Sequence, residues 1–221
     1  MGLIEVENVF LIADLCGYTA LTEVHGNLHA ADAVARYAEI ARGALQPGAV
    51  LMERVGDEVV IVADEAAIAV RTAIALRAAV EREQLFPALR SGVHSGSVVP
   101  QGDGYVGGAL NLAARVAAHA RAGQILCTHR ITALAIGCDD VTYQPLGLVR
   151  FKNIVDPVSV FEVVVGGQSS EAKVIDPVCR MQLQPDTAPA RLPLGGRTYH
   201  FCSFECARAF ADRPDHYVTP P

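Results

Sequence analysis

The sequence predicts an α/β or α+β protein built on one mixed sheet, followed by a small cysteine-bearing module. Three observations lead to this prediction. Short β-rich runs alternate with helical patterns through the first three quarters of the chain. A polar, glycine-bearing segment interrupts the alternation at residues 166–173. Beyond it, three of the six cysteines cluster near the C-terminus. We therefore expect domains at residues 1–165 and 174–221, joined by a linker.

The expected elements follow from local pattern. Apolar β-rich runs predict strands at 9–13, 49–54, 58–63, 89–100, 124–128 and 158–165. Amphipathic or alanine-rich runs predict helices at 19–24, 28–45, 65–84 and 111–121. The second and third strands flank Gly56-Asp57, which is typical of a hairpin turn. A glycine-rich loop at 101–108 and a turn from Phe151 complete the pattern.

Composition limits the function. The 221 residues are 51% hydrophobic, which is enough for a substantial core, and the net charge of -6 argues against nucleic acid or anionic membrane as a partner. No apolar run reaches the length of a membrane span and no signal peptide is evident, so we expect a cytoplasmic protein with reduced thiols. Cys16, Cys127 and Cys138 are expected to be small core residues.

Two aspartates lie where an apolar run meets a glycine. Asp14 follows the first strand and Asp57 lies at the hairpin tip. Each could be an ordinary cap or turn residue by itself. Brought together, they would form a site for Mg²⁺, which binds carboxylate and phosphate oxygens. The pair therefore predicts phosphate chemistry.

Five motifs in order carry a family resemblance. They are Ala-Asp-Leu-Cys-Gly-Tyr-Thr from residue 13, Val-Gly-Asp-Glu from 55, Arg-Ser-Gly-Val-His-Ser-Gly from 90, Gly-Gly-Ala-Leu-Asn-Leu-Ala-Ala-Arg from 107, and Gly-Gln-Ile-Leu from 123. The first domain resembles the class III adenylate/guanylate cyclase catalytic domain. This resemblance implies an α+β sandwich with a ferredoxin-like βαββαβ core and a head-to-tail homodimer with active sites at the interface.

The resemblance also implies a metal and triphosphate site. Asp14 and Asp57 would hold two Mg²⁺ or Mn²⁺ ions, one activating the ribose 3′-hydroxyl and both neutralising charge at the phosphates. Backbone N–H groups at a helix start would bind the triphosphate. These groups belong to Leu15, Cys16, Gly17, Tyr18 and Thr19.

Four further side chains match the family pattern. Arg90 would contact pyrophosphate. Asn111 and Arg115, one turn apart on a helix, would orient the ribose and stabilise the α-phosphoryl transition state. Lys152 would lie near the phosphates. The last three would act on metals held by the other protomer, so catalysis would rest on positioning and electrostatics.

Two positions are expected to distinguish adenine from guanine in the nucleotide substrate. Adenylate cyclases of this family have a lysine where this chain has Glu53, and an aspartate or threonine near Gly104. Glu53 could accept hydrogen bonds from guanine, or be an exposed hairpin charge paired with a neighbouring arginine. Gly104 supplies no side chain, although Asp103 is adjacent. The family favours ATP, whereas Glu53 favours GTP.

The C-terminal segment resembles a YHS domain. The match rests on Asp-Pro-Val-Cys-Arg-Met from residue 176 and Tyr-His-Phe-Cys-Ser-Phe-Glu-Cys from residue 199. The resemblance implies a small treble-clef-like fold associated with heavy metals. Cys179, Cys202 and Cys206 are candidate ligands for Zn²⁺ or Cu⁺. A fourth ligand would be His200, His216, Asp176 or water; thiols without metal are the alternative.

The sequence thus leaves three functions open. The leading prediction is a nucleotidyl cyclase acting on a nucleoside triphosphate, tuned by metal or redox state through the YHS domain. The second is a catalytically weak or inactive regulator with a cyclase fold, and the third is a metal-trafficking protein. His94 is expected to be structural, and His25, His29 and His119 to be solvated.

Overall fold

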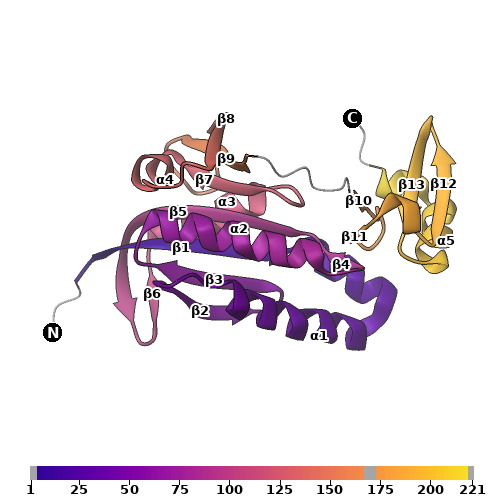
Figure 1. Ribbon diagram of the computed structural model, residues 1–221, viewed down its shortest axis with the longest axis horizontal. Helices are drawn as coiled ribbons and strands as arrows, with labels where there is room; N and C mark the ends of the chain where they lie inside the picture. Colours follow the sequence, from indigo (N-terminus) through magenta and orange to yellow (C-terminus); the bar gives the residue numbers. More distant parts are fainter. Residues whose placement is uncertain (1–3, 167–172, 219–221) are drawn as a thin grey trace.

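The computed structural model describes residues 4–166 and 173–218 (Figure 1). The first and last three residues and most of the expected 166–173 linker lie outside the described residues. None of the helices within the described ranges is both long and apolar enough to cross a membrane.

One long sheet forms the spine of the first domain (Figure 1). Its strands run in the order β2-β3-β1-β5-β7-β9-β8, and β6 pairs with β5. The bounds are β1 (Val6–Leu15), β2 (Ala49–Val55), β3 (Glu58–Ala63), β5 (Leu89–Gln101), β6 (Gly104–Val106), β7 (Ile125–Thr128), β8 (Val141–Val149) and β9 (Val158–Val165). β1, β2, β3 and β5, with the helices between them, form the predicted ferredoxin-like βαββαβ core.

Helices cover both faces of this sheet. They are α1 (Tyr18–Ala44), α2 (Ala66–Arg82), α3 (Gly108–His119) and the short α4 (His129–Leu134). Alternate residues of β1 serve the two faces: Leu11 joins the large core under α1 and α2, whereas Phe10 and Ile12 join a smaller core under α3. β1 is therefore buried on both sides, which explains its continuous apolar run.

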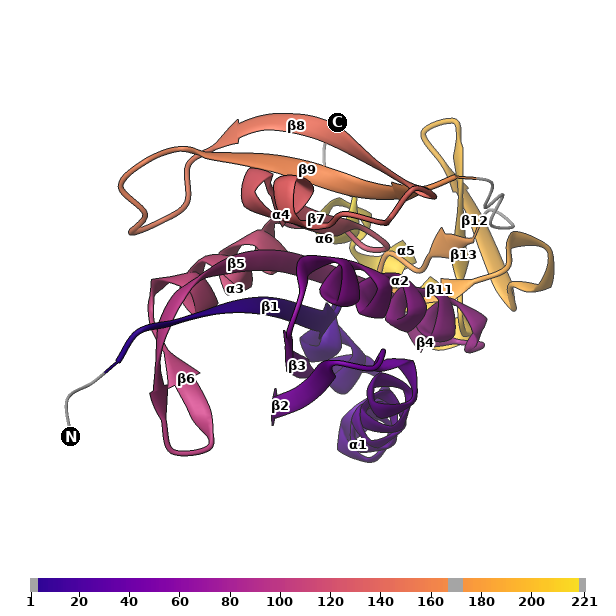
Figure 2. The ribbon, with the colours of Figure 1, turned by 60° about the vertical axis from the view of Figure 1, so that its left-hand side comes forward.

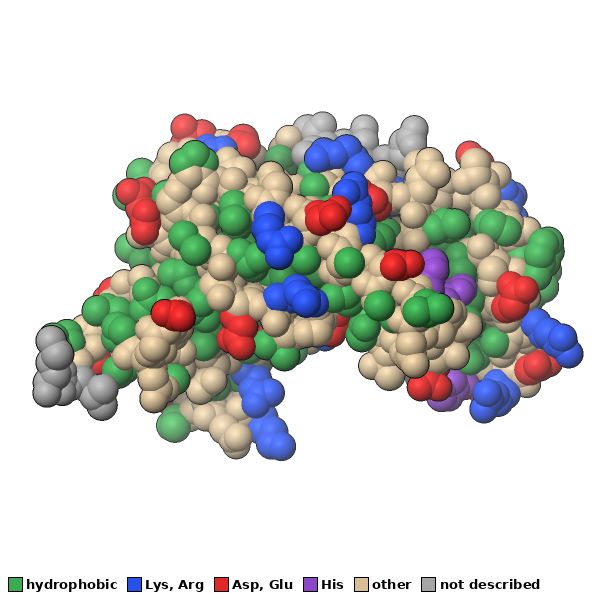
Figure 3. Space-filling view, turned by 90° about the horizontal axis from the view of Figure 1, so that it is seen from below, with side chains coloured by type: hydrophobic (Ala, Val, Ile, Leu, Met, Phe, Trp, Pro, Cys, Tyr) green, Lys and Arg blue, Asp and Glu red, His purple; other side chains and the backbone are tan. Residues whose placement is uncertain are grey.

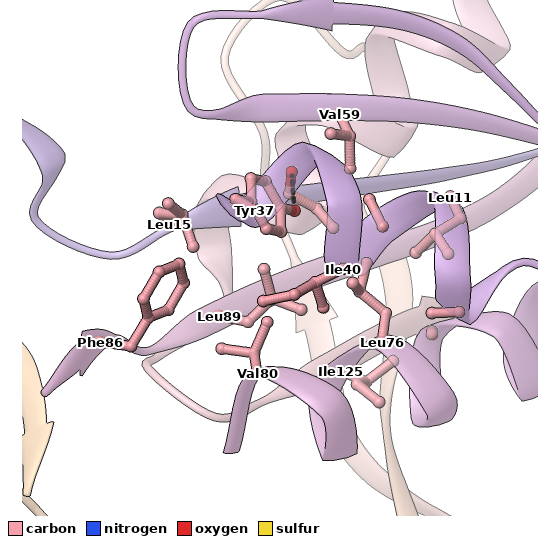
Figure 4. Close-up of a cluster of buried hydrophobic side chains, with 14 of the residues drawn as sticks. Leu11, Leu15, Tyr37, Ile40, Val59, Leu76, Val80, Phe86, Leu89 and Ile125 are labelled. Atoms are coloured by element: carbon pink, nitrogen blue, oxygen red, sulfur yellow. Dashed lines mark hydrogen bonds between the residues drawn. The ribbon is translucent and has the colours of Figure 1, made fainter. Parts of the chain in front are cut away.

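The core beneath α1 and α2 also anchors the strand that carries Asp14. Tyr37 of α1 is fully buried, and its hydroxyl donates a hydrogen bond of 3.0 Å to the Ala13 carbonyl (Figure 4). Leu11, Leu76 and Ile125 come from separate elements and belong to the same buried cluster. Burial raises the pKa of the Tyr37 hydroxyl, so this group stays a neutral donor.

The first domain differs from the expected elements in one helix and in elements that were not predicted, among them β6, α4 and β8. β6 lies within the expected glycine-rich loop at 101–108. The two predicted helices at 19–24 and 28–45 form one helix, α1, with a break at Gly26, whose φ of 82° is non-helical. The strand β8 was not predicted, because Pro145 and Gly147 interrupt its apolar pattern; the register shifts between these two residues. The remaining expected strands and helices are present with small changes in their ends.

The C-terminal part forms small sheets and two short helices. It contains β10 (Val174–Ile175), β11 (Met181–Leu183), a 3₁₀ turn (Pro185–Thr187), β12 (Ala190–Leu194), β13 (Arg197–Phe201), α5 (Phe204–Asp212) and α6 (Pro214–Tyr217). The β12–β13 hairpin and α5 enclose a core centred on Phe201 and Phe210, whose ring centroids are 5.2 Å apart. Figure 2 shows this part against one end of the main sheet.

The C-terminal part packs closely against the first domain. β11 pairs with β4 (Phe86–Pro87), so a three-stranded sheet joins the two halves of the chain. Lys173 Nζ donates to the carbonyl oxygens of Glu81, in the last turn of α2, and of Glu83, which follows the helix. Apolar side chains of both parts belong to one continuous core. We therefore expect the shared sheet and core to fix the orientation of the C-terminal part relative to the first domain.

Candidate active site

Asp14 and Asp57 are brought together at one edge of the ferredoxin-like core. Asp14 lies near the end of β1, opposite Glu58 of β3 and Arg90 of β5. Asp57 lies in the β2–β3 turn, and its carbonyl accepts a hydrogen bond of 3.3 Å from Leu15 N. The sheet register therefore sets the relative position of the two carboxylates.

Arg90 holds one oxygen of Asp14. Its Nε and Nη2 lie 2.8 and 2.5 Å from Asp14 Oδ2, and Nη1 donates to the Ala118 carbonyl of α3. Only 16% of the Asp14 side chain is exposed. A partly buried ion pair of this kind fixes the carboxylate more firmly than a surface pair would.

Asp57 is in an environment that disfavours its negative charge. Burial, and next the charge of Asp14, raise its pKa to about 6. The same two causes raise the pKa of Glu58. Three carboxylates thus converge where Arg90 is the cation in direct contact, and this arrangement fits a bound divalent cation, which would relieve their repulsion.

The loop after Asp14 leads into α1 through a glycine in the left-handed conformation. Gly17 has φ 77°, a left-handed value that suits glycine. The N–H groups of Leu15 and Cys16 are already used, donating to the carbonyls of Asp57 and Ala88. The first-turn amides of α1, including Tyr18 and Thr19, have no intrahelical acceptor and are available for an anion. Of the amides expected to bind the triphosphate, those of Leu15 and Cys16 are therefore engaged within the protein.

Cys16 differs from the expected core residue. It is only half-buried beside Asp14 and Arg90, and burial raises the pKa of its thiol to about 11. It is therefore a neutral group at this site. Cys127 and Cys138 are buried as expected.

Three expected site residues make no direct polar contact with the two aspartates among the described residues: Asn111, Arg115 and Lys152. Asn111 and Arg115 are exposed on α3, and Lys152 is exposed in the β8–β9 connection. Within residues 4–166 and 173–218, no hydrogen bond or ion pair links any of them to Asp14 or Asp57. The direct polar contacts of Asp14 and Asp57 among the described residues therefore do not include these three side chains.

The two positions expected to contact the nucleotide base lie on β2 and β6. Glu53 is exposed on β2, next to a register shift in the β2–β3 pairing. Gly104 begins β6, and a Cβ added there would lie 4.0 Å from Met52 Sδ. No ion pair of Glu53 with an arginine is present among the described residues, so the predicted alternative of a paired hairpin charge is not supported.

A second cluster of potential ligands lies in the C-terminal part. Cys179, Cys202 and Cys206 are buried, with Cys202 Sγ 3.3 Å from Cys179 Sγ and 3.6 Å from Cys206 Sγ. Hydrogen bonds from the other two thiols lower the pKa of Cys206, and a hydrogen bond with Cys202 raises that of Cys179. The three predicted soft-metal ligands are thus brought together.

The fourth member of this cluster is a residue that the sequence did not identify. It is His25 of α1, whose Nε2 lies 3.5 Å from Cys202 Sγ and 3.7 Å from Cys206 Sγ. The expectation that His25 is merely solvated was wrong. His200 and His216 are not part of the group. No sequence signal could have found His25, because it lies 177 residues from Cys202.

The side-chain carboxylate of Asp176 supports this cluster by accepting hydrogen bonds from backbone N–H groups beside the cysteines. Its carboxylate is buried, and Oδ1 accepts from Val178 N at 2.8 Å and Cys179 N at 3.4 Å. Oδ2 accepts from Cys202 N at 2.8 Å. Both oxygens are therefore committed to positioning the ligand loops, and Asp176 is not the fourth ligand.

Comparison with known proteins agrees with this architecture. The fold matches the adenylyl cyclase CyaB of P. aeruginosa with a TM-score of 0.65 and 22% identity, covering 77% of this chain and 100% of that one. In sequence, the chain is 31% identical over 155 residues to a pH-sensitive adenylate cyclase of Mycobacterium tuberculosis, covering 68% of this chain and 39% of the relative.

The C-terminal part has relatives of its own. Residues 174–220 match the YHS domain family. A copper-transporting P-type ATPase of Rhizobium leguminosarum is 42% identical over 52 residues, which are 24% of this chain and 6% of that protein. The chain spans less than half the length of these two curated relatives. The first part of the chain is thus similar in sequence and fold to class III adenylate/guanylate cyclase catalytic domains, and the C-terminal part matches the YHS domain family.

Proposed function

We propose that the chain is a nucleotidyl cyclase that converts ATP, with GTP as the alternative, to the 3′,5′-cyclic nucleotide and pyrophosphate. The ribose 3′-oxygen bonds to the α-phosphorus, the bond from that phosphorus to pyrophosphate breaks, and the 3′-hydroxyl proton passes to solvent or substrate. The observation that carries the proposal is the pairing of Asp14 and Asp57 beside a helix start.

The proposed active site consists of two half-sites from different protomers. One half-site contains Asp14 and Asp57, and the other contains Asn111, Arg115 and Lys152. Asp14 and Asp57 hold two Mg²⁺ or Mn²⁺ ions, and the amides of residues 17–19 bind the triphosphate. Arg90 steadies Asp14 and reaches the pyrophosphate. Asn111, Arg115 and Lys152 come from the other protomer of a head-to-tail homodimer, which their exposure supports.

The domain plan and location form part of the proposal. Residues 1–165 form the cyclase domain and 174–221 the YHS domain, in a cytoplasmic protein whose thiols stay reduced. The similarity to a copper-transporting ATPase supports soft-metal binding by Cys179, Cys202 and Cys206. Metal or redox state at these cysteines would regulate the cyclase domain, because the two parts share a sheet.

A second candidate is a weak or inactive regulator with the cyclase fold. One observation favours it: the expected partner of Glu53 in base recognition is Gly104, which offers no side chain. Nucleotide would then bind without efficient turnover.

An assay of the purified chain separates the two candidates. With Mg²⁺ or Mn²⁺ and either ATP or GTP, we expect a cyclic product detectable by chromatography. Asp57→Asn should lower its rate at least about 100-fold, since a bound metal contributes several kcal/mol to the transition state. Asp32→Asn, an exposed carboxylate on α1, is the matched control and should keep full activity. Lack of product from either nucleotide, at concentrations where the dimer forms, would favour the regulator.

A further inference from the structure

The group formed by His25 and the three cysteines crosses the boundary between the two domains. Four ligand atoms, one imidazole nitrogen and three sulfurs, all lie within 4.8 Å of one another. His25 belongs to the cyclase domain, and the sulfurs belong to the YHS domain. Figure 3 shows histidine side chains gathered at the side of the molecule that carries the YHS domain.

The spacing of these atoms fits one tetrahedral ion. Zn–S bonds of about 2.3 Å and Zn–N bonds of about 2.0–2.1 Å place tetrahedral ligands about 3.8 Å apart for two sulfurs and about 3.5 Å apart for nitrogen and sulfur. The observed sulfur separations are 3.3 and 3.6 Å, and the nitrogen–sulfur separations are 3.5 and 3.7 Å. The two sulfur pairs would move apart by about 0.2–0.5 Å, and the nitrogen–sulfur pairs would change by about 0.2 Å or less, so binding an ion needs little movement of the chain.

The ligands are held by the fold before any ion binds. Asp176 fixes the backbone at Cys179 and Cys202, as described above. Ser203 caps α5 by accepting a hydrogen bond from Cys206 N, which places Cys206 one turn into the helix. The three cysteines are buried, whereas His25 is only partly buried, so His25 lies on the side open to an entering ion.

We propose that His25, Cys179, Cys202 and Cys206 bind one Zn²⁺ ion and so form a metal clamp between the cyclase and YHS domains. One imidazole with three thiolates is a ligand set of structural zinc sites. Binding replaces thiol protons by the metal and releases them to solvent, with no change of oxidation state. The site is closed by four protein ligands, so its role is structural rather than catalytic.

The clamp acts on the first helical segment of α1, which follows Asp14. His25 ends the first segment of α1, just before the break at Gly26, and Gly17 begins it. On the other side, the stem of Arg180, next to Cys179, packs on Gly17 so closely that a Cβ there would collide with it. Both ends of residues 17–25 thus touch the YHS domain. Under the proposed function, the start of this segment binds the triphosphate, so the clamp would position a part of the active site. That consequence rests on the proposed function, whereas the metal site does not.

Metal binding can be measured on the full chain without nucleotide. The reduced protein should bind one Zn²⁺ per chain in competition with a chromogenic chelator. Co²⁺ in its place should give the absorption bands of a tetrahedral thiolate site. His25→Ala should weaken Zn²⁺ binding at least about 10–100-fold, the loss that even an outer-shell partner causes. His29→Ala is the matched control, because its ring centroid lies 5.3 Å from that of His25 yet it is outside the group.

The variants also separate ligation from folding. His25→Cys should retain tight binding and shift the Co²⁺ spectrum toward four thiolates, which a merely structural histidine would not do. The proposal is overturned if His25→Ala binds Zn²⁺ as tightly as the wild type, since the cysteines would then suffice. It is equally overturned if the reduced protein binds no Zn²⁺, or if mass spectrometry finds Cys179 and Cys202 joined as a disulfide under reducing conditions. Cyclase activity is not needed for any of these readouts.

Discussion

Arg90 directs two N–H groups at a single oxygen of Asp14, with Nε and Nη2 at 2.8 and 2.5 Å from Oδ2. The two residues are direct neighbours in the β1–β5 register. The guanidinium compensates the charge of a carboxylate that is largely buried and lies beside Asp57. Oδ1 of Asp14 is the oxygen that this pairing leaves for a metal ion. The ion pair is therefore both a structural support and a part of the proposed site.

Arg90→Gln should destabilise the metal-free protein by about 1–3 kcal/mol, because a partly buried carboxylate loses its charged hydrogen-bond donors. Mg²⁺ should recover more thermal stability in this variant than in the wild type, since the cation replaces the lost charge. Thermal unfolding with and without Mg²⁺ measures both effects. Arg36→Gln is the control: its pair with Glu83 is exposed, so its loss should change the thermal midpoint little and show no such recovery. Equal responses of the two variants would contradict the role of Arg90.

Shared sites between protomers predict complementation. Asp57→Asn and Arg115→Ala should each be inactive alone. When they are mixed, about half of the dimers are mixed and each has one intact site, so about a quarter of wild-type activity should return. A mixture of Asp57→Asn with Asp14→Asn is the control and should stay inactive, because both changes affect the same half-site. If tagged mixed dimers form without activity, the assignment of Arg115 to the partner's site is wrong.

Glu53→Lys should shift the preference from GTP toward ATP. A carboxylate accepts hydrogen bonds from guanine, whereas an ammonium group donates to adenine. The ratio of kcat/KM for the two nucleotides should change by about 10–100-fold, as expected for one or two specific hydrogen bonds. Glu53→Gln removes the charge at similar size and should give a smaller shift. An unchanged ratio in the lysine variant would exclude Glu53 from base recognition.

His94 should make the fold sensitive to acid. Burial, and next the positive charge of Arg130, lower the pKa of His94 to about 4, and its Nδ1 lies 2.8 Å from Thr128 Oγ1. An unfolded histidine has a pKa of about 6.5, so between about pH 6.5 and 4 the unfolded chain binds a proton that the folded chain does not. Stability should therefore fall as pH falls through this window.

Thermal midpoints at about pH 7.5 and 5 measure this effect. His94→Gln can keep a hydrogen bond to Thr128 but does not ionise, so its midpoint should change less between the two conditions. His129→Gln, at an exposed position on α4, should behave as the wild type. If the histidine at position 94 has no influence on the pH dependence, burial is not the dominant cause of its shift.

Local pattern predicted most of the first domain. The apolar runs around Leu11 and Ile61 and the turn at Gly56-Asp57 are short-range features, and the structure has each of them. β8 was missed because its pleat is interrupted at Pro145 and Gly147, so only its pairing with β9 makes it a strand. Propensity is a weak guide where long-range pairing decides.

The fold class, the order of the motifs and the residue types suited to phosphate and soft-metal chemistry can be inferred from the chain without a structure. Asp14, Asp57 and the three C-terminal cysteines are evident there, because carboxylates at strand ends and clustered thiols are local features. Which of these groups meet depends on the packing of the folded chain. This packing engaged Asp14 with Arg90, joined β4 to β11, and placed His25 against cysteines more than 150 residues away. Contacts at such separations depend on how whole elements pack, and no local periodicity in the chain records them.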